Sequence, residues 1–205
     1  MRVAVVGGTG PFGKALAARL HEAGIEVVIG SRETERAESV AAELDVHGAA
    51  NADAVRGVDL VVLATNADAT LETARALKNE IGSTPVLSVA SELEFTKGGV
   101  LPTRDARSLA ERIQGELDGP VVAGLHSLAA STLGKQAPDE DALVCGDDAD
   151  AKSLVLGLAE RVVAGRALDA GPLQSARALE GLTAVIVNLN KRYRGHAGLT
   201  ITGLP

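Results

Sequence analysis

Three glycines near the start of the chain have the spacing of a phosphate-binding turn. Gly8, Gly10 and Gly13 fit G-x-G-x-x-G, between an apolar run at 3–6 and a stretch of helical character. In such a turn the first glycine makes the tight bend, the second lets the backbone approach a pyrophosphate, and the third lets helix and strand pack closely. Pro11 suits the first turn of the helix, whose free N–H groups and positive dipole end attract phosphate. A glycine triplet alone is weak evidence, because many glycine-rich turns bind nothing.

Hydroxyl and basic side chains follow the next expected strand, residues 25–29. A dinucleotide fold that selects NAD places Asp or Glu at this point, where the carboxylate accepts from the ribose 2′-hydroxyl. This chain has Ser31 and Arg32 instead, and Arg36 lies one helical turn after Arg32. Because Arg meets phosphate with a fork of donors, the three residues favour a 2′-phosphate and therefore NADP(H). The alternative is that both arginines pair with neighbouring glutamates on a solvated helix.

Strands and helices alternate along the first part of the chain. This order predicts βαβ units, right-handed crossovers and a Rossmann-type α/β fold with a doubly wound parallel sheet. We expect residues 91–102 to form a glycine-containing loop. The strands are expected at 3–6, 25–29, 45–49, 58–64, 85–90 and 120–125. The first helix is expected to start at Pro11, and further helices are expected at 33–44, 52–56, 69–81 and 104–117. Asn51 is the expected cap of the helix at 52–56.

The chain changes character after residue 125. Expected strands lie at 142–146 and 166–169, helices lie at 149–162 and from Pro172 onwards, and 199–202 is a candidate edge strand. We therefore expect two domains. Residues 1–125 are expected to form the NADP(H)-binding Rossmann domain, and residues 126–205 a smaller C-terminal α/β domain.

Further candidate ligand contacts follow from the rule that ligands of such folds lie beyond the carboxyl ends of the strands. Thr65 and Asn66 follow the fourth expected strand, Ala90 ends the fifth, and His126 follows the strand at 120–125. Asn66 is suited to bonding a ribose or a carboxamide, although turn formation explains it equally well. His126 is the only histidine expected at this edge, where it serves either as a ligand contact or as a structural donor.

The composition argues against several classes of function. A net charge of −7 and only three aromatic residues argue against nucleic acid as a partner. The single cysteine, Cys145, rules out an internal disulfide and is consistent with a reducing compartment. With no recognisable signal peptide or membrane span, we expect a cytoplasmic protein without membrane contacts. No group of side chains has metal-ligand spacing, so no metal is expected.

No arrangement of side chains is typical of a catalytic nucleophile or general acid. Reduction of a carbonyl usually needs a proton donor, whereas passing a hydride between two carriers mainly needs two rings held face to face. Small residues near His126, including Gly124, Ser127 and Ala129, leave room for a second flat ring. The pattern therefore favours direct hydride transfer.

Several further blocks of sequence extend these motifs over essentially the whole chain. They are Gly7-Gly8-Thr9-Gly10 with Gly13-Lys14, Gly30-Ser31-Arg32, Val121-Val122-Ala123 to His126, Val144-Cys145-Gly146-Asp147-Asp148, Asp169-Ala170-Gly171-Pro172-Leu173, Leu182-Thr183, Asn190-Lys191-Arg192-Tyr193 and Ala197 to Gly203. In these blocks the chain resembles the NADPH:coenzyme F420 oxidoreductase family. It departs from the family at Asn66-Ala67, where Pro-Trp is common, and at Leu125 and Ser127, where an aromatic residue and Asn are common.

The resemblance implies a pocket for an 8-hydroxy-5-deazaflavin, formed by the second domain and the last strand of the first. Its reactive carbon would stack near the nicotinamide. The resemblance carries this pocket onto His126, Ser127, Leu128, Ala129, Gly198 and Leu199.

A basic cluster, Lys191, Arg192, Arg194 and His196, ends the last long helix. Cations at a helix C-terminus stabilise the macrodipole by roughly 0.3–1 kcal/mol each. The cluster is also placed to bind the phosphodiester and glutamate tail of the coenzyme. Both interpretations stay open.

Together the motifs and the resemblance predict an oxidoreductase, an NADPH-dependent F420 reductase. We expect reversible hydride transfer between NADP(H) and coenzyme F420, by a homodimer whose partners are small redox carriers. The alternatives are an NADPH-dependent reductase of another acceptor, such as a flavin or small ketone, and a module that senses NADP(H) without turnover. His126 is expected to position the rings, and no residue is an obligate acid or base. The expected NADP(H) contacts are Gly8, Thr9, Gly10, Pro11, Phe12, Gly13, Ser31, Arg32, Arg36, Thr65, Asn66 and Ala90.

Overall fold

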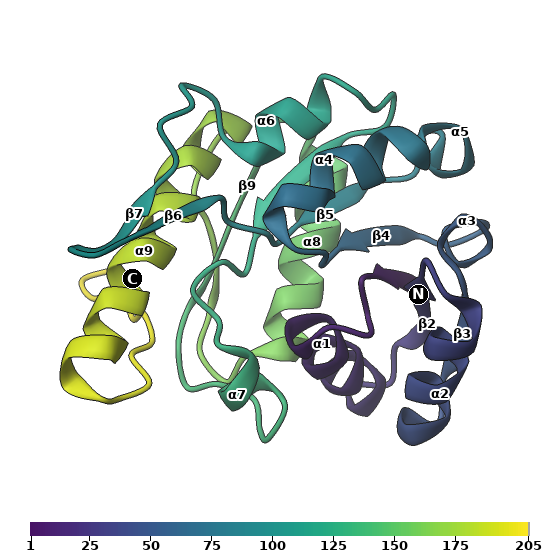
Figure 1. Ribbon diagram of the computed structural model, residues 1–205, viewed down its shortest axis with the longest axis horizontal. Coiled ribbons are helices and arrows are strands. Elements are labelled where there is room, and N and C mark those ends of the chain that lie inside the picture. Colours follow the sequence, from purple (N-terminus) through teal and green to yellow (C-terminus); the bar gives the residue numbers. More distant parts are fainter. Residues whose placement is uncertain (205) are drawn as a thin grey trace.

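An eight-stranded sheet forms the centre of the protein, whose computed structural model describes residues 1–204 (Figure 1). Its strand order is β10-β9-β8-β5-β4-β1-β2-β3. Neighbouring strands run parallel except β8 and β9, which run antiparallel. In chain order the strands are β1 (Arg2–Val6), β2 (Glu26–Ser31), β3 (His47–Ala50), β4 (Leu60–Leu63), β5 (Val86–Ser88), β8 (Val121–Gly124), β9 (Ala142–Gly146) and β10 (Ala167–Asp169).

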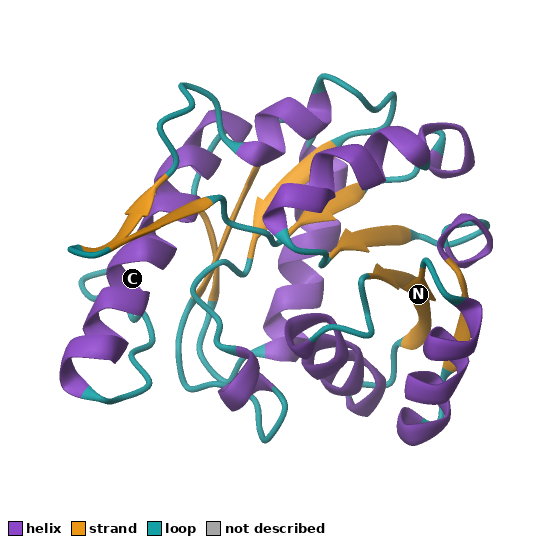
Figure 2. Cartoon of the chain, in the orientation of Figure 1, coloured by secondary structure: helices purple, strands orange, loops and turns teal. Residues whose placement is uncertain are grey.

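Helices cover both faces of this sheet (Figure 2). Because successive strand residues point to opposite faces, Val3 and Val5 of β1 join one core and Ala4 and Val6 join the other. The first core includes α1 (Pro11–Glu22), α2 (Thr34–Leu44) and α8 (Ala149–Val162), and the second includes α4 (Ala67–Ala76), α6 (Leu109–Gln114) and α9 (Ala176–Tyr193). The expected doubly wound Rossmann-type fold is confirmed. The shorter helices are α3 (Asn51–Ala54), α5 (Lys78–Ile81), α7 (Ala130–Leu133) and a 3₁₀ turn at Leu173–Ser175.

The strands after residue 125 join the same sheet. β9 pairs with β8, with Cys145 opposite Ala123, and β10 pairs with β9. Asp148 caps α8 by accepting a hydrogen bond from the N–H of Ala151 at 2.8 Å, and this helix has the expected bounds. The division into two domains at residue 125 stays a prediction. None of the described helices is long and apolar enough to span a membrane.

Residues 91–102 contain a β-hairpin, so the expected loop was wrong. Its strands are β6 (Leu93–Thr96) and β7 (Gly99–Pro102). Asn188 of α9 donates to the carbonyl of Val100 at 2.7 Å and accepts from its N–H at 2.8 Å. The helix thus supplies hydrogen bonds that a third strand would otherwise make. Figure 1 shows the hairpin lying along α9.

Two helices are shorter in the structure than the sequence pattern predicts. The helix expected at 69–81 divides into α4 and α5, because Leu77 leaves helical geometry with φ −103° and ψ 5°. The helix expected at 104–117 spans only Leu109–Gln114, because Ser108 begins it in a reciprocal capping box with Glu111.

The expected cap of the third helix was also wrong. α3 begins at Asn51 itself, with Ala50 in the cap position, and no side chain caps it. The side chain of Asn51 is directed elsewhere, toward the edge of the sheet described below.

The candidate edge strand at 199–202 does not form. Instead, the N–H groups of Leu199 and Ile201 donate to the carboxylates of Glu140 and Asp141, at 3.1 and 2.8 Å. The carbonyl of Leu199 also accepts from the N–H of Asp141 at 2.7 Å, so side chains and a backbone bond hold this segment without a strand ladder.

Candidate functional site

The glycine-rich turn joins β1 to α1 through very close backbone contacts. Gly7 has a left-handed φ of 83° in this bend, and the N–H of Gly8 closes the turn onto the carbonyl of Val5 at 3.1 Å. A Cβ on Gly8 would lie 2.8 Å from the carbonyl oxygen of Val5, and a Cβ on Gly13 would overlap the carbonyl oxygen of Gly7. These contacts confirm that Gly13 allows close packing of helix and strand.

Helix α1 presents its positive end at this turn. It begins at Pro11 after Gly10, and its first turn carries no acidic residue. Since the first N–H groups of a helix lack intrahelical partners, this end is suited to bind an anionic phosphate.

A hollow of about 160 Å³ opens at the carboxyl ends of β1, β2, β3 and β4. It brings together Thr9, Gly10, Ser31, Arg32, Arg36, Thr65 and Asn66, all of them expected from the sequence. It also contains residues that were not among the expected NADP(H) contacts: Gly7, Glu33, Asn51, Ala64, Ala69 and Thr73. Asn51 directly follows β3, and this position beside β2 is the signal by which it could have been found.

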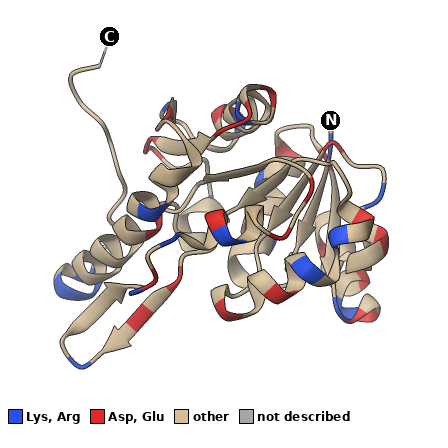
Figure 3. Cartoon of the chain, turned by 90° about the horizontal axis from the view of Figure 1, so that it is seen from above, with Lys and Arg blue, Asp and Glu red and all other residues tan. Residues whose placement is uncertain are grey.

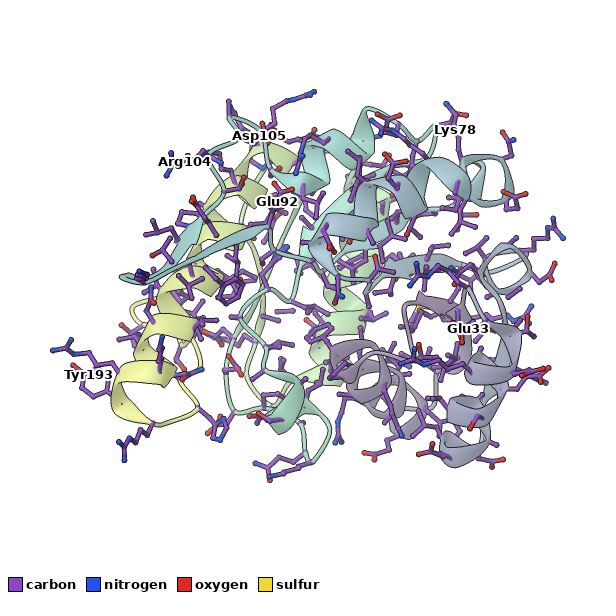
Figure 4. All side chains as sticks on the ribbon, viewed as in Figure 1. Glu33, Lys78, Glu92, Arg104, Asp105 and Tyr193 are labelled. Carbon is purple, nitrogen blue, oxygen red and sulfur yellow. The ribbon has the colours of Figure 1, made fainter. Side chains whose placement is uncertain are left out.

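Arg32 and Arg36 line this hollow without acidic partners. Within residues 1–204, no ion pair includes either side chain, so the alternative of pairing with neighbouring glutamates is not observed. The Ser31 Oγ accepts from the N–H of Glu33 at 3.2 Å, which fixes the turn between β2 and α2. Figure 4 shows Glu33 beside the start of α2. Two guanidinium groups are thereby available to an anion.

The other expected NADP(H) contacts lie outside the wall of the hollow. Gly8 and Gly13 are buried beneath it, whereas Pro11 is exposed. Phe12 packs against the core on the α1 face, and Ala90 belongs to the core on the opposite face. For these residues, direct contact with the cofactor stays a prediction.

His126 is buried where β8 ends. The residue before it, Leu125, has a left-handed φ of 64°, which is unusual for a side chain of this size. Among the described residues, neither ring nitrogen of His126 has a hydrogen-bond partner. Burial lowers the pKa of His126 from 6.5 to about 4, so the ring is neutral at physiological pH.

A chain of hydroxyl groups ties the backbone of His126 to neighbouring elements. The Thr183 Oγ1 donates to the His126 carbonyl at 3.0 Å, and it lies 2.8 Å from the Ser91 Oγ. These bonds link β8 with α9 and with the segment after β5. They position the histidine without using its ring.

The expected deazaflavin contacts are not gathered into one large cavity. The space beside His126 and Ser127 measures about 10 Å³ and is closed by Leu143, Leu179 and Leu182. That is about the volume of a single water probe. Leu128 is buried and Ala129 half-buried near α7, whereas Gly198 and Leu199 pack on Glu140. The role of all six residues in binding a deazaflavin stays a prediction.

The basic cluster surrounds the end of α9. Lys191 and Arg192 lie in its last turn and Arg194 follows with a left-handed φ of 55°. No ion pair formed by the described residues includes these three side chains. Figure 3 shows this positive end of the helix, and Figure 4 shows Tyr193 projecting beside it into solvent. Both interpretations of the cluster remain open.

Comparison with known proteins links the fold to a family. The family described as "NADP oxidoreductase coenzyme F420-dependent" matches residues 2–92. F420-dependent NADP reductases of Methanothermobacter thermautotrophicus and Methanocaldococcus jannaschii are each 34% identical over 223 residues, spanning 100% of this chain and 96% and 99% of theirs. A solved protein of Arthrobacter sp. FB24, described as a candidate F420-dependent NADP reductase, superposes with TM-score 0.85 at 28% identity. The superposition spans 99% of this chain and 100% of that one.

His126 generates a prediction about stability and pH. Its pKa is about 4 in the folded protein and 6.5 as the unfolded reference, so between these values the unfolded state binds more protons. The free energy of unfolding should therefore lose about 3 kcal/mol from this group as pH falls from 6.5 to 4. Urea denaturation across this range should show wild type losing about 3 kcal/mol more than His126→Gln, because the opposite contribution of Glu180, whose pKa burial raises to about 7, is common to both proteins. His21→Gln, a change at an exposed histidine, is the control. Parallel curves for wild type and His126→Gln would contradict the burial of a neutral ring.

Proposed function

Because this chain belongs to the family of F420-dependent NADP reductases, we propose that it transfers a hydride reversibly between NADP(H) and coenzyme F420. The observation that carries the NADP(H) part is that the guanidinium groups of Arg32 and Arg36 line the hollow at the end of β2 and have no ion-pair partner among residues 1–204. A 2′-phosphate is the group that distinguishes NADP from NAD, and it matches these donors in charge and geometry.

The glycine turn and α1 hold the pyrophosphate. Gly7 and Gly13 bring the backbone and the helix N-terminus to the edge of the sheet, and Thr9 and Gly10 line the hollow beside them. Ser31, Arg32 and Arg36 hold the 2′-phosphate one strand away. The remaining expected NADP(H) contacts are assigned to the same cofactor: Gly8, Pro11, Phe12, Thr65, Asn66 and Ala90.

When bound, the nicotinamide and the deazaflavin would supply the redox chemistry. The protein contributes alignment, and proximity of this kind can account for roughly 7–11 kcal/mol of a barrier. His126 has a pKa of about 4 because it is buried, so it is assigned to ring positioning and not to proton transfer at neutral pH. Ser127, Leu128, Ala129, Gly198 and Leu199 complete the proposed deazaflavin site.

We also propose that the enzyme is a cytoplasmic homodimer that does not bind nucleic acid. The exposed side chains of Phe95 and Leu101 on the hairpin, and of Val185, Leu189 and Tyr193 on α9, support an interface between two copies. Sedimentation equilibrium should give twice the chain mass of 20.9 kDa. A species with the mass of one chain would contradict the dimer without affecting the assignment of activity.

Nucleotide selectivity should depend on Arg32. Loss of a charge-assisted hydrogen bond should make Arg32→Ala bind NADPH about 10- to 150-fold more weakly, with little change for NADH. Isothermal titration of both nucleotides into both proteins measures this. Arg104→Ala, which removes a highly exposed arginine outside the hollow (Figure 4), is the matched control. Equal weakening of NADPH and NADH would mean that Arg32 does not read the phosphate.

Direct hydride transfer is tested with isotopically labelled cofactor. NADPH carrying deuterium stereospecifically on the nicotinamide should deliver the label to the ring carbon of reduced F420. Mass spectrometry of the product measures where the deuterium lies. Label recovered in water would exclude direct transfer and require a proton-exchanging group in the protein.

A further inference from the structure

Asn51 lies at the carboxyl end of β3, one strand beyond the residues assigned to the 2′-phosphate. In the parallel pair formed by β2 and β3, Ala50 lies opposite Ser31, so Asn51 follows directly after that register point. Adjacent strands lie roughly 4.8 Å apart, which is within the reach of one amide side chain and one phosphate. Asn51 lines the same hollow as Ser31, Arg32 and Arg36.

The side chain of Asn51 has hydrogen-bonding capacity that the folded chain leaves unused. Its Oδ1 is buried and has no partner among residues 1–204. This oxygen rests over Gly30, where an added Cβ would lie 2.9 Å from it. A helix cap would have been an ordinary use for an asparagine here, but no side chain caps α3. Buried polar atoms without partners are rare in native proteins, so this oxygen indicates a partner outside the chain.

We infer that Asn51 is a specificity-determining residue that reads the phosphorylated ribose of NADP(H), an inference that rests on the proposed function. Arginine can only donate, whereas an amide both donates and accepts. The 2′-phosphate accepts hydrogen bonds and the neighbouring 3′-hydroxyl donates one. The two ends of the Asn51 amide match this pair of groups, and a turn of the side chain away from Gly30 would carry its buried Oδ1 to the hydroxyl.

Other acceptors in this part of the hollow are less suited to the task. The Ser31 Oγ already accepts from the N–H of Glu33. The carboxylate of Glu33 is exposed and carries the same sign of charge as the phosphate. Asn51 is therefore the neutral acceptor available beside the arginines.

Two substitutions of Asn51 separate its donor from its acceptor. Asn51→Ala removes both and should weaken NADPH about tenfold, while NADH changes less than about threefold. Asn51→Asp keeps an acceptor of the same size but replaces the donor by a negative charge. It should weaken NADPH about 100-fold and leave NADH nearly unchanged. Isothermal titration measures all four affinities, and thermal melting confirms that each variant is folded.

A fragment of the cofactor tests the site without the nicotinamide or F420. Adenosine 2′,5′-bisphosphate carries the phosphorylated ribose, whereas 5′-AMP lacks its 2′-phosphate. Asn51→Asp should weaken the bisphosphate about as much as NADPH, while 5′-AMP changes less than about threefold. Equal weakening of both fragments would place Asn51 on the adenine or the 5′ side and overturn the inference.

Matched controls separate the loss of this contact from a general change in charge. Asn79→Asp introduces the same charge at an exposed position of α5, outside the hollow, and should leave both affinities unchanged. Glu33→Gln removes the competing acceptor and should not weaken NADPH. If wild type and the Asn51 variants bind NADPH and the bisphosphate equally well, this inference fails but the proposed NADP(H) function stands. If wild type binds neither, the proposed NADP(H) function fails.

Discussion

Gly13 of α1 touches the carbonyl of Gly7 at the end of β1, and no side chain at position 13 could fit between them. This contact sets the distance between helix and strand, so the first turn of α1 opens directly onto the edge of the sheet. Strands β2, β3 and β4 end at the same edge because they run parallel to β1 in register. Residues far apart in the sequence, such as Ser31 and Thr65, therefore line one hollow beside the helix N-terminus.

The charges in this hollow differ from those in the rest of the protein. The chain has 27 acidic and 20 basic residues, so acidic partners are plentiful. Arg75 pairs with two glutamates and Arg166 pairs with Asp141, whose pKa it holds well below the usual range. Arg32 and Arg36 have no such partner within the described part of the chain. Together with a helix end free of acidic residues, these two side chains create a positive site in an acidic protein, as an anionic ligand requires.

Signals that are local in the sequence predicted most of the first half of the fold. The signals for the glycine turn with Pro11, for the alternation of strands and helices, and for α8 all lie in residues that are close together in the sequence. The hairpin at 91–102 and the segment at 199–202 could not be predicted in this way. Their hydrogen bonds come from Asn188, Glu140 and Asp141, which are remote in sequence. Asn51 was misassigned for the same reason, because its surroundings include Gly30 of the neighbouring strand.

The site around His126 shows the limit of inference from resemblance. His126 matches the family whereas Leu125 and Ser127 depart from it, and the space beside the ring is small. The proposed hydride transfer between NADP(H) and F420 is tested most directly by mixing the protein with both carriers under anaerobic conditions and recording the visible spectrum. The account predicts that the absorption band of oxidised F420 disappears with NADPH and far more slowly with NADH. A band that persists with NADPH, in a protein that binds the nucleotide, would contradict hydride transfer to F420.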